Sequence, residues 1–197
     1  MGLFSRRKAA APGGPRPDLI VPLLAGQAWM DANTETFCQI PDFPAEAWPF
    51  ASPICPGLYA TYAIDPGPSW ETVQVGDVEG YGGGEALQAK ALANLRQRGP
   101  IEAQVTGGRA LLEVTNELDL SASLLLDPER WLEGLELGSE LVVAVPTRIA
   151  IMVCAATDSE SVATLTEAAR EHFTQGDGKP VSPDLYRLSL AGLAPLA

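Results

Sequence analysis

The stretch LVVAVPTRIAIMVCA (Leu141–Ala155) contains two short, almost wholly apolar segments, Leu141–Val145 and Ile149–Ala155. Segments of this length and composition are typical of strands that are covered on both faces. The Pro146-Thr147-Arg148 run between them leaves room only for a tight connection. The stretch therefore predicts a buried β-hairpin, and its turn is where the hairpin reaches water.

Further strands are predicted from β-favouring runs that are bounded by turn residues. These runs are Leu58–Ile64, Glu71–Val75, Ile101–Thr106 and Arg109–Thr115, with a last one around Tyr186–Leu190. Gly107-Gly108 separates the third from the fourth, with the spacing and composition of a two-residue hairpin turn.

Three helices are predicted from apolar residues at helical spacing and from their end signals. They are Glu85–Arg98, a short helix from Asp127-Pro128 to Leu135, and a helix from Thr157 to about Thr174. Thr157 and Glu160 form a capping box at the start of the last one. Hairpins mixed with separate helices predict an α+β fold, with a mixed or antiparallel sheet built of hairpins and helices packed on it.

The N-terminal part of the chain is less regular. Residues 1–17 predict a flexible tail, and residues 18–197 a single α+β domain, of which 58–190 form the core and 18–57 a helix followed by a Pro-rich loop. Asp18–Asn33 approximates helical spacing, although Pro22 fits only within a first turn. The loop is either functional or packed down by its aromatic residues, and we favour packing. These residues are Phe37, Phe43, Trp48 and Phe50.

The formal net charge of −12, from 25 acidic and 13 basic residues, bears on the partners of the protein. Nucleic acids and anionic membranes are bound by clustered Lys and Arg, so neither is an expected partner. An acidic surface is compatible with a basic protein partner. No apolar run approaches the ~20 residues of a membrane helix, so we expect a cytoplasmic protein. The oligomeric state stays open.

The cysteine and histidine content limits which disulfides, metal sites and catalytic groups the protein can form. Cys38, Cys55 and Cys154 are odd in number, widely spaced and form no Cys-x-x-Cys motif, which favours reduced thiols in a cytosol. A Cys38–Cys55 disulfide stays open. His172 is the only histidine, so we expect no zinc site, and no cofactor motif is present. We expect His172, beside Phe173, at the edge of the core, and we assign no catalytic residue.

Two other features invite a functional interpretation. The glycine-rich run Gly80–Gly84 precedes a predicted helix but lacks the further residues of a phosphate-binding loop, so it predicts a flexible loop into a helix cap. The acidic residues around it lack the spacing of a metal-binding loop, so we interpret them as solubilising charge. They are Asp65, Glu71, Asp77, Glu79 and Glu85.

Arg148 is the one candidate site residue. Its planar guanidinium suits a carboxylate or a phosphate. If the arginine caps carbonyls or pairs with an acid inside the fold, Arg148→Ala should cost about 1–3 kcal/mol through unsatisfied partners. If it contacts a ligand or a partner, the same change should leave stability almost unaltered and abolish binding. Both interpretations stay open.

Five short motifs along the chain carry a resemblance to a known family. They are LYATYAIDPGPSWETVQ, ALANLRQR, SASLLLDPERW, GSELVVAVPTR and SPDLY, between Leu58 and Tyr186. In this order they resemble the YtpQ-like family of bacterial proteins of unknown function, over about Leu58–Leu190. The resemblance implies an α+β domain of the bacterial cytosol without a known activity or cofactor. Ser121 and Ile149 stand where the family commonly has Asp, which weakens any carry-over of a shared activity. The residues that do match are Asn94, Ser123, Trp131, Pro146 and Arg148.

Together these features predict a non-enzymatic interaction or regulatory module with an acidic surface, one version of which is an inhibitor of a basic protein. The alternative is an enzyme or small-ligand binder with a pocket near Arg148. A clustered acidic patch without a deep cleft would favour the interaction module. A deep pocket that holds both Arg148 and His172 would favour the enzyme.

Overall fold

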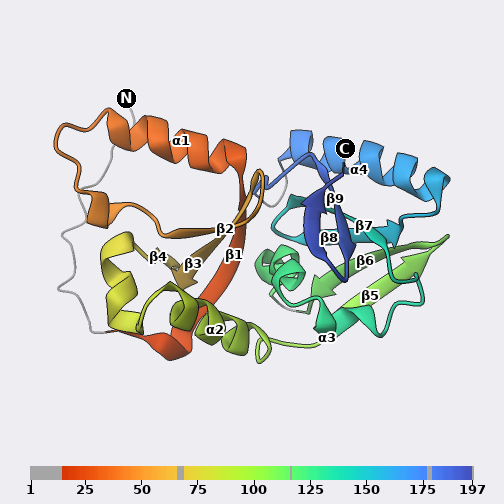
Figure 1. Cartoon of the computed structure of the whole chain (residues 1–197), viewed down its shortest axis with the longest axis horizontal. Coiled ribbons are helices and arrows are strands. Elements are labelled where there is room, and N and C mark those ends of the chain that lie inside the picture. The colour runs from red at the N-terminus through yellow and green to blue at the C-terminus, as the bar shows by residue number, and fades with distance from the viewer. Residues whose placement is uncertain (1–14, 66–68, 116, 177–178, 197) are drawn as a thin grey trace.

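The computed structural model of the chain describes residues 15–65, 69–115, 117–176 and 179–196. It contains two antiparallel sheets, of four and six strands, with helices packed on them, which confirms the predicted α+β class. Figure 1 shows the two sheets side by side, with the N-terminal sheet on the left. No helix among the described residues is long and apolar enough to cross a membrane.

The second sheet is built around the predicted buried hairpin. Its strand order is β10-β9-β7-β8-β6-β5. The bounds are β5 Ile101–Thr106, β6 Arg109–Val114, β7 Leu141–Thr147, β8 Ala150–Ala155, β9 Leu185–Ser189 and β10 Gly192–Pro195. Gly107 and Gly108 both have positive φ, 55° and 77°, as the two-residue turn between β5 and β6 requires.

The central strand β7 is covered on both faces, as its composition predicts. Val143 and Val145 point to the main core, whereas Val142 and Ala144 pack against helix α4, Ser159–Gln175. This division follows from the strand pleat, which sends successive side chains to opposite faces. The helix begins one residue later than its predicted capping box, because the carboxylate of Asp158 accepts the hydrogen bond from the Ser161 backbone nitrogen (3.1 Å).

The first sheet corrects the first part of the helix predicted over Asp18–Asn33, whereas the second part, residues 27–33, is helical as predicted. Ile20–Gly26 is strand β1, all seven residues of which are buried. It pairs antiparallel with β3, Leu58–Ile64, whose predicted bounds are confirmed. Apolar residues at spacings of one, three and four occur in a strand buried on both faces as well as in a helix, so the pattern alone does not separate them. Pro22 is tolerated because β1 is an edge strand.

The predicted Pro-rich loop is also partly regular. Helix α1 occupies Gln27–Cys38, and β2, Ala51–Cys55, pairs with β3. The predicted strand Glu71–Val75 shortens to the two-residue β4, Glu71–Thr72. The remaining helical segments are 3-10 turns η1 Pro17–Leu19, η2 Ala45–Ala47, η3 Val75–Tyr81 and η4 Leu118–Leu126, with α2 Gly84–Leu95 and α3 Glu129–Leu132.

The predicted tail ends earlier than residue 17. Residues 1–14 lie outside the described residues. Arg16, however, forms an ion pair with Glu71, and its backbone nitrogen donates to the hydroxyl of Tyr81 (3.4 Å). The carbonyl of Pro17 accepts a hydrogen bond from Asn94 (2.8 Å). Arg16 and Pro17 therefore belong to the fold.

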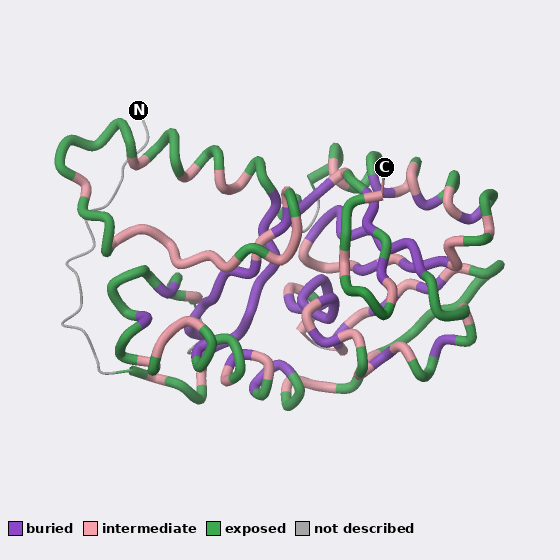
Figure 2. Tube along the Cα trace, in the orientation of Figure 1, coloured by how far each residue is buried: buried purple, intermediate pink, exposed green. Residues whose placement is uncertain are grey.

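One hydrophobic cluster joins the two sheets, with buried members from β1, β3, β6, β7 and β8. Turn η4 lies within it, against β1, β6 and β8. Two buried serines tie this turn to its neighbours: Ser121 Oγ accepts from the Val114 backbone nitrogen (3.0 Å), and Ser123 Oγ donates to the Pro22 carbonyl (2.8 Å). Figure 2 shows the buried segments running through the middle of both halves.

Candidate functional site

Arg148 lies in the turn between β7 and β8, as predicted. Its backbone nitrogen donates to the Lys179 carbonyl (3.1 Å), and its carbonyl accepts from the Ala122 backbone nitrogen (3.0 Å). The turn is therefore fixed from two sides, by η4 and by the segment that follows α4. The backbone of Arg148, from which its side chain extends, is therefore held in place.

The guanidinium of Arg148 has no hydrogen bond and no ion pair with any residue in the described part of the chain. The residue is half-buried. Burial lowers the pKa of Arg148, and the more distant carboxylate of Asp119 partly opposes this. The internal partners that a purely structural role requires are thus not supplied by the described residues.

Arg148 lines a cavity of about 340 Å³. This volume lies in the range of small-molecule sites. The end of β1, the start of α1, the end of α4 and the segment after α4 form its walls. The lining residues are Leu24, Ala25, Ala28, Trp29, Arg148, Phe173, Lys179 and Pro180. Two cations thus meet otherwise apolar walls, and no acidic residue is among the described lining residues.

The other residues on which the resemblance to the YtpQ-like family rests have structural partners. Asn94 Nδ2 donates to two backbone carbonyls, Trp131 Nε1 donates to the Leu124 carbonyl (2.8 Å), and the Pro146 carbonyl accepts from the Val181 backbone nitrogen (2.8 Å). Ser123 ties η4 to β1. Unlike the side chains of Asn94, Ser123 and Trp131, the side chain of Arg148 has no hydrogen-bond partner among the described residues.

His172 does not lie where the sequence predicts. It is exposed near the end of α4, not at the edge of the core, and it is not among the residues that line the Arg148 cavity. Its neighbour Phe173 does line that cavity. Residues on consecutive helix positions point about 100° apart, and here Phe173 faces the cavity whereas His172 points to solvent. The combination of Arg148 and His172 in one pocket, which would favour an enzyme, is absent among the described residues.

The three cysteines are unpaired: Cys38 is exposed, Cys55 is half-buried and Cys154 is buried. Burial raises the pKa of Cys154 to about 11, with a further contribution from Asp158. Within the described residues, no three His, Cys, Asp or Glu side chains come together as ligands for a metal ion.

The glycine-rich run is more ordered than a flexible loop. Its first part belongs to η3, which ends at Tyr81, and Gly82 and Gly83 have positive φ of 87° and 94°. Gly83 is the N-cap of α2, so the run does lead into a helix cap. Of the acidic residues near it, Asp65 pairs with Arg98 (3.0 Å), and Asp77 accepts a capping hydrogen bond from Gln74 (2.9 Å).

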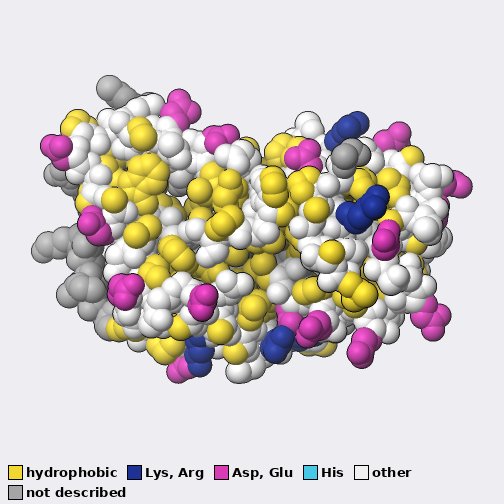
Figure 3. Space-filling view, viewed as in Figure 1, with side chains coloured by type: hydrophobic (Ala, Val, Ile, Leu, Met, Phe, Trp, Pro, Cys, Tyr) yellow, Lys and Arg dark blue, Asp and Glu magenta, His cyan; other side chains and the backbone are white. Residues whose placement is uncertain are grey.

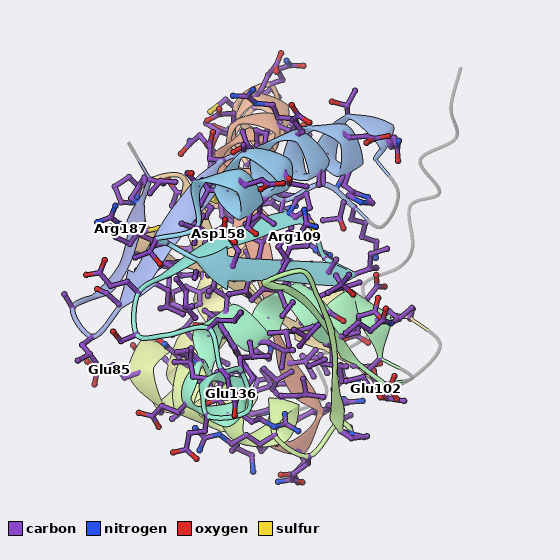
Figure 4. All side chains as sticks on the ribbon, turned by 90° about the vertical axis from the view of Figure 1, so that its right-hand side faces the viewer. Glu85, Glu102, Arg109, Glu136, Asp158 and Arg187 are labelled. Carbon is purple, nitrogen blue, oxygen red and sulfur yellow. The ribbon has the colours of Figure 1, made fainter. Side chains whose placement is uncertain are left out.

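A second cavity, of about 270 Å³, lies between α4 and the β5–β6 hairpin. Arg109 lines it, and the nearby carboxylate of Asp158 attracts this arginine. Figure 4 shows both residues beneath α4. The positive charge in this cavity therefore has an acidic neighbour, as Arg148 and Lys179 have in Asp119.

Helix α1 forms a surface that the sequence interpretation missed. None of its twelve residues is buried. Its inner side carries Phe37, which stacks on Phe43 at a centroid distance of 4.6 Å and meets Trp48 at 5.5 Å. These rings are only half-buried, and Ile40 beside them is 46% exposed. The aromatic residues thus pack together, as predicted, but they also remain accessible. Figure 3 shows hydrophobic side chains gathered beside α1.

The same part of the chain is acidic throughout. Between Arg16 and Lys90 there is no Lys, Arg or His. The ten acidic residues of that segment are Asp18, Asp31, Glu35, Asp42, Glu46, Asp65, Glu71, Asp77, Glu79 and Glu85. Those of α1 and the loop after it are exposed, and none has an ion pair with another described residue. We define the α1 surface as Asp31, Glu35, Phe37, Ile40, Asp42, Phe43, Glu46 and Trp48.

The Arg148 cavity lies at the start of α1, where Trp29 lines it, whereas the aromatic group of the α1 surface lies at the other end of the helix. Their chemistry is opposite: one is acidic with exposed apolar residues, and the other is cationic with apolar walls. No family model, no curated protein and no solved structure matches the chain, so the two sites are characterised by their own residues.

Proposed function

We propose that the protein is a non-enzymatic interaction module of the bacterial cytosol that binds a basic protein partner through the α1 surface. The observation that carries this proposal is helix α1 itself, twelve residues long with none of them buried. A helix in a globular protein normally hides one face, and most of its stability comes from that burial. A partner that covers α1 would supply the missing contacts.

The composition of the α1 surface fits a protein partner. Aromatic side chains are enriched among the residues that dominate binding energy, and here Phe37, Phe43 and Trp48 form one preassembled group. Asp31 and Glu35 lie on other sides of the same helix and form no ion pair with another described residue. Charges at the rim of an interface steer association and reject partners of like charge. A basic surface with an apolar centre is the complement of this arrangement.

An inhibitor that covers a basic enzyme or toxin is one version of this proposal. Such a protein needs a complementary surface and no chemistry of its own. The resemblance to the YtpQ-like family stays a prediction, and it implies no activity that competes with binding. The net charge of −12 adds long-range attraction for a basic partner.

The enzyme alternative has less support. General acid–base or nucleophilic catalysis needs a titratable group near a substrate. The described lining of the Arg148 cavity contains no histidine, acid, serine or cysteine. Its two cations can bind an anion, but Lys179 is the one candidate among the lining residues for proton transfer. Ligand binding is therefore the better-supported role for that cavity.

A pull-down from the host lysate with two matched double variants tests the proposal. Asp31→Lys/Glu35→Lys reverses two charges of the α1 surface. Glu129→Lys/Glu133→Lys makes the same change in net charge at exposed positions of α3 and the residue after it. We expect the wild type and the α3 variant to capture the same basic protein and the α1 variant to lose it. Equal capture by all three, or capture of only acidic proteins, would contradict the proposal.

A further inference from the structure

We infer that the cavity at Arg148 binds a small organic acid, with a carboxylate held by Arg148 and Lys179 and an apolar, ring-sized body held between Trp29 and Phe173. This goes beyond the proposed function, since it concerns a ligand site on the cationic side of the α1–β1 junction. Neither site needs the other to be occupied.

The first support is the state of Arg148. A charged side chain that leaves water normally gains a partner, because the unpaired charge is costly to desolvate. Arg148 is half-buried, yet no described residue forms a hydrogen bond or an ion pair with its guanidinium. Its backbone is held at both ends by Lys179 and Ala122. The backbone of Arg148 is thus fixed, the described residues leave its guanidinium donors unused, and a carboxylate is an anion that fits the planar fork of this group.

Lys179 supplies the second cation. It follows α4 in a backbone conformation with φ of 62°, and its carbonyl accepts the hydrogen bond from Arg148. Its ammonium lies 3.5 Å from Asp119 Oδ2, and Asp119 is also the carboxylate whose field reaches Arg148. Among the described residues, one acid therefore serves two cations, which gives this part of the site an excess of positive charge in a protein of net charge −12.

The apolar lining residues indicate which kind of group carries the carboxylate of the ligand. Trp29 and Phe173 are both half-buried and line the cavity from different helices, and Leu24, Ala25 and Pro180 complete an apolar enclosure. An inorganic anion would leave these walls unused. A carboxylate on an aromatic or aliphatic ring uses both the cations and the walls, and about 340 Å³ is enough space for it.

Calorimetric titration of the full-length protein tests the inference, with benzoate, phenylacetate and indole-3-acetate as probes. Phenylacetamide has the shape of phenylacetate without the charge. We expect at least one carboxylate to bind. The affinity of its amide should be lower by a factor of at least roughly ten, because a charge-assisted hydrogen bond is lost. Arg148→Gln should weaken the carboxylate by a similar factor and leave the weak binding of the amide unchanged.

Two controls keep the test decisive. Arg109→Gln removes an arginine of the second cavity and should leave the affinity unaltered. Lys179→Gln changes an exposed side chain and should weaken the carboxylate without affecting folding, which covers the case in which Arg148→Gln fails to fold. No binding of any of the three carboxylates at millimolar concentration would overturn the inference. Equal binding of acid and amide, or an equal loss in the Arg109 variant, would overturn it as well.

Discussion

Asn94 shows how the protein accommodates a buried polar side chain. Its amide nitrogen donates to the carbonyls of Pro17 and Ile20, both at 2.8 Å, and so holds the start of β1 against α2. Asn94→Ala would leave two carbonyls without these donors and should lower the free energy of unfolding by about 2 kcal/mol. Urea denaturation measures this, with the exposed Gln97→Ala as the control on the same helix end. An effect no larger than that of the control would contradict the role given to Asn94.

Replacement of Arg148, unlike that of Asn94, should leave the free energy of unfolding almost unchanged. Since no described residue accepts a hydrogen bond from its guanidinium, Arg148→Ala leaves no acceptor unsatisfied. We expect the free energy of unfolding to change by less than about 0.5 kcal/mol, as at a surface position. The same denaturation experiment checks this. A loss of about 1–3 kcal/mol would instead indicate a structural arginine with internal partners.

The three cysteines should differ sharply in reactivity. The thiolate is the reactive form, and burial raises the pKa of Cys154 to about 11, so only about one in a thousand Cys154 side chains is ionised at pH 8. Cys38 is exposed. Iodoacetamide at pH 8 followed by peptide mass mapping should therefore modify Cys38 rapidly and Cys154 hardly at all. The rate at Cys154 should rise about tenfold per pH unit up to its pKa. Rapid labelling of Cys154 in the folded protein at pH 8 would disprove this.

At the scale of elements, the junction of β1 and α1 depends on a close backbone contact. A Cβ added at Gly26 would lie 1.7 Å from the carbonyl oxygen of Val181, which belongs to the segment between α4 and β9. Gly26→Ala must push these segments apart, and we expect it to cost at least about 3 kcal/mol. Gly134→Ala, whose added Cβ meets nothing closer than 3.7 Å, is the matched control. Equal melting temperatures for the two variants would show that the two segments can move apart at little cost in stability.

The sequence predicts the second sheet better than the first for a physical reason. The hairpins β5–β6 and β7–β8 join strands that are close in sequence, so their turns and patterns carry the information locally. Strand β1 pairs with β3, which lies more than thirty residues later along the chain. Its burial on all seven residues erases the alternation that would mark it as a strand. Turn η4 is likewise shaped by what surrounds it, through Ser121 and Ser123.

Of the candidate sites, the sequence predicts only the place of Arg148, because a turn between two apolar strands must reach water. The cavity around it is built from β1, α1, α4 and the segment after α4, which no local pattern brings together. The α1 surface is missed for a related reason. The aromatic residues Phe37, Phe43 and Trp48 predict packing, and they do pack, but only the fold shows that the described residues leave them partly exposed.

At the scale of the whole molecule, charge is divided unevenly. The segment between Arg16 and Lys90 builds the first sheet, α1 and the first half of α2, and its ten acidic residues are met only by cations from outside it. Arg16, Lys90 and Arg98 pair with three of them. One end of the molecule is therefore a concentrated acidic field, and attraction to it should weaken as salt shortens the screening length.

The dissociation constant of the purified partner for three forms of the protein tests this account most directly. We compare the wild type with Asp31→Lys/Glu35→Lys on the α1 surface and with Glu129→Lys/Glu133→Lys near α3. If the α1 surface is the interface, the first variant raises the dissociation constant at least about tenfold, whereas the second changes it by less than about twofold. An equal effect of both variants would show that the partner responds only to net charge, and would contradict a binding site at α1.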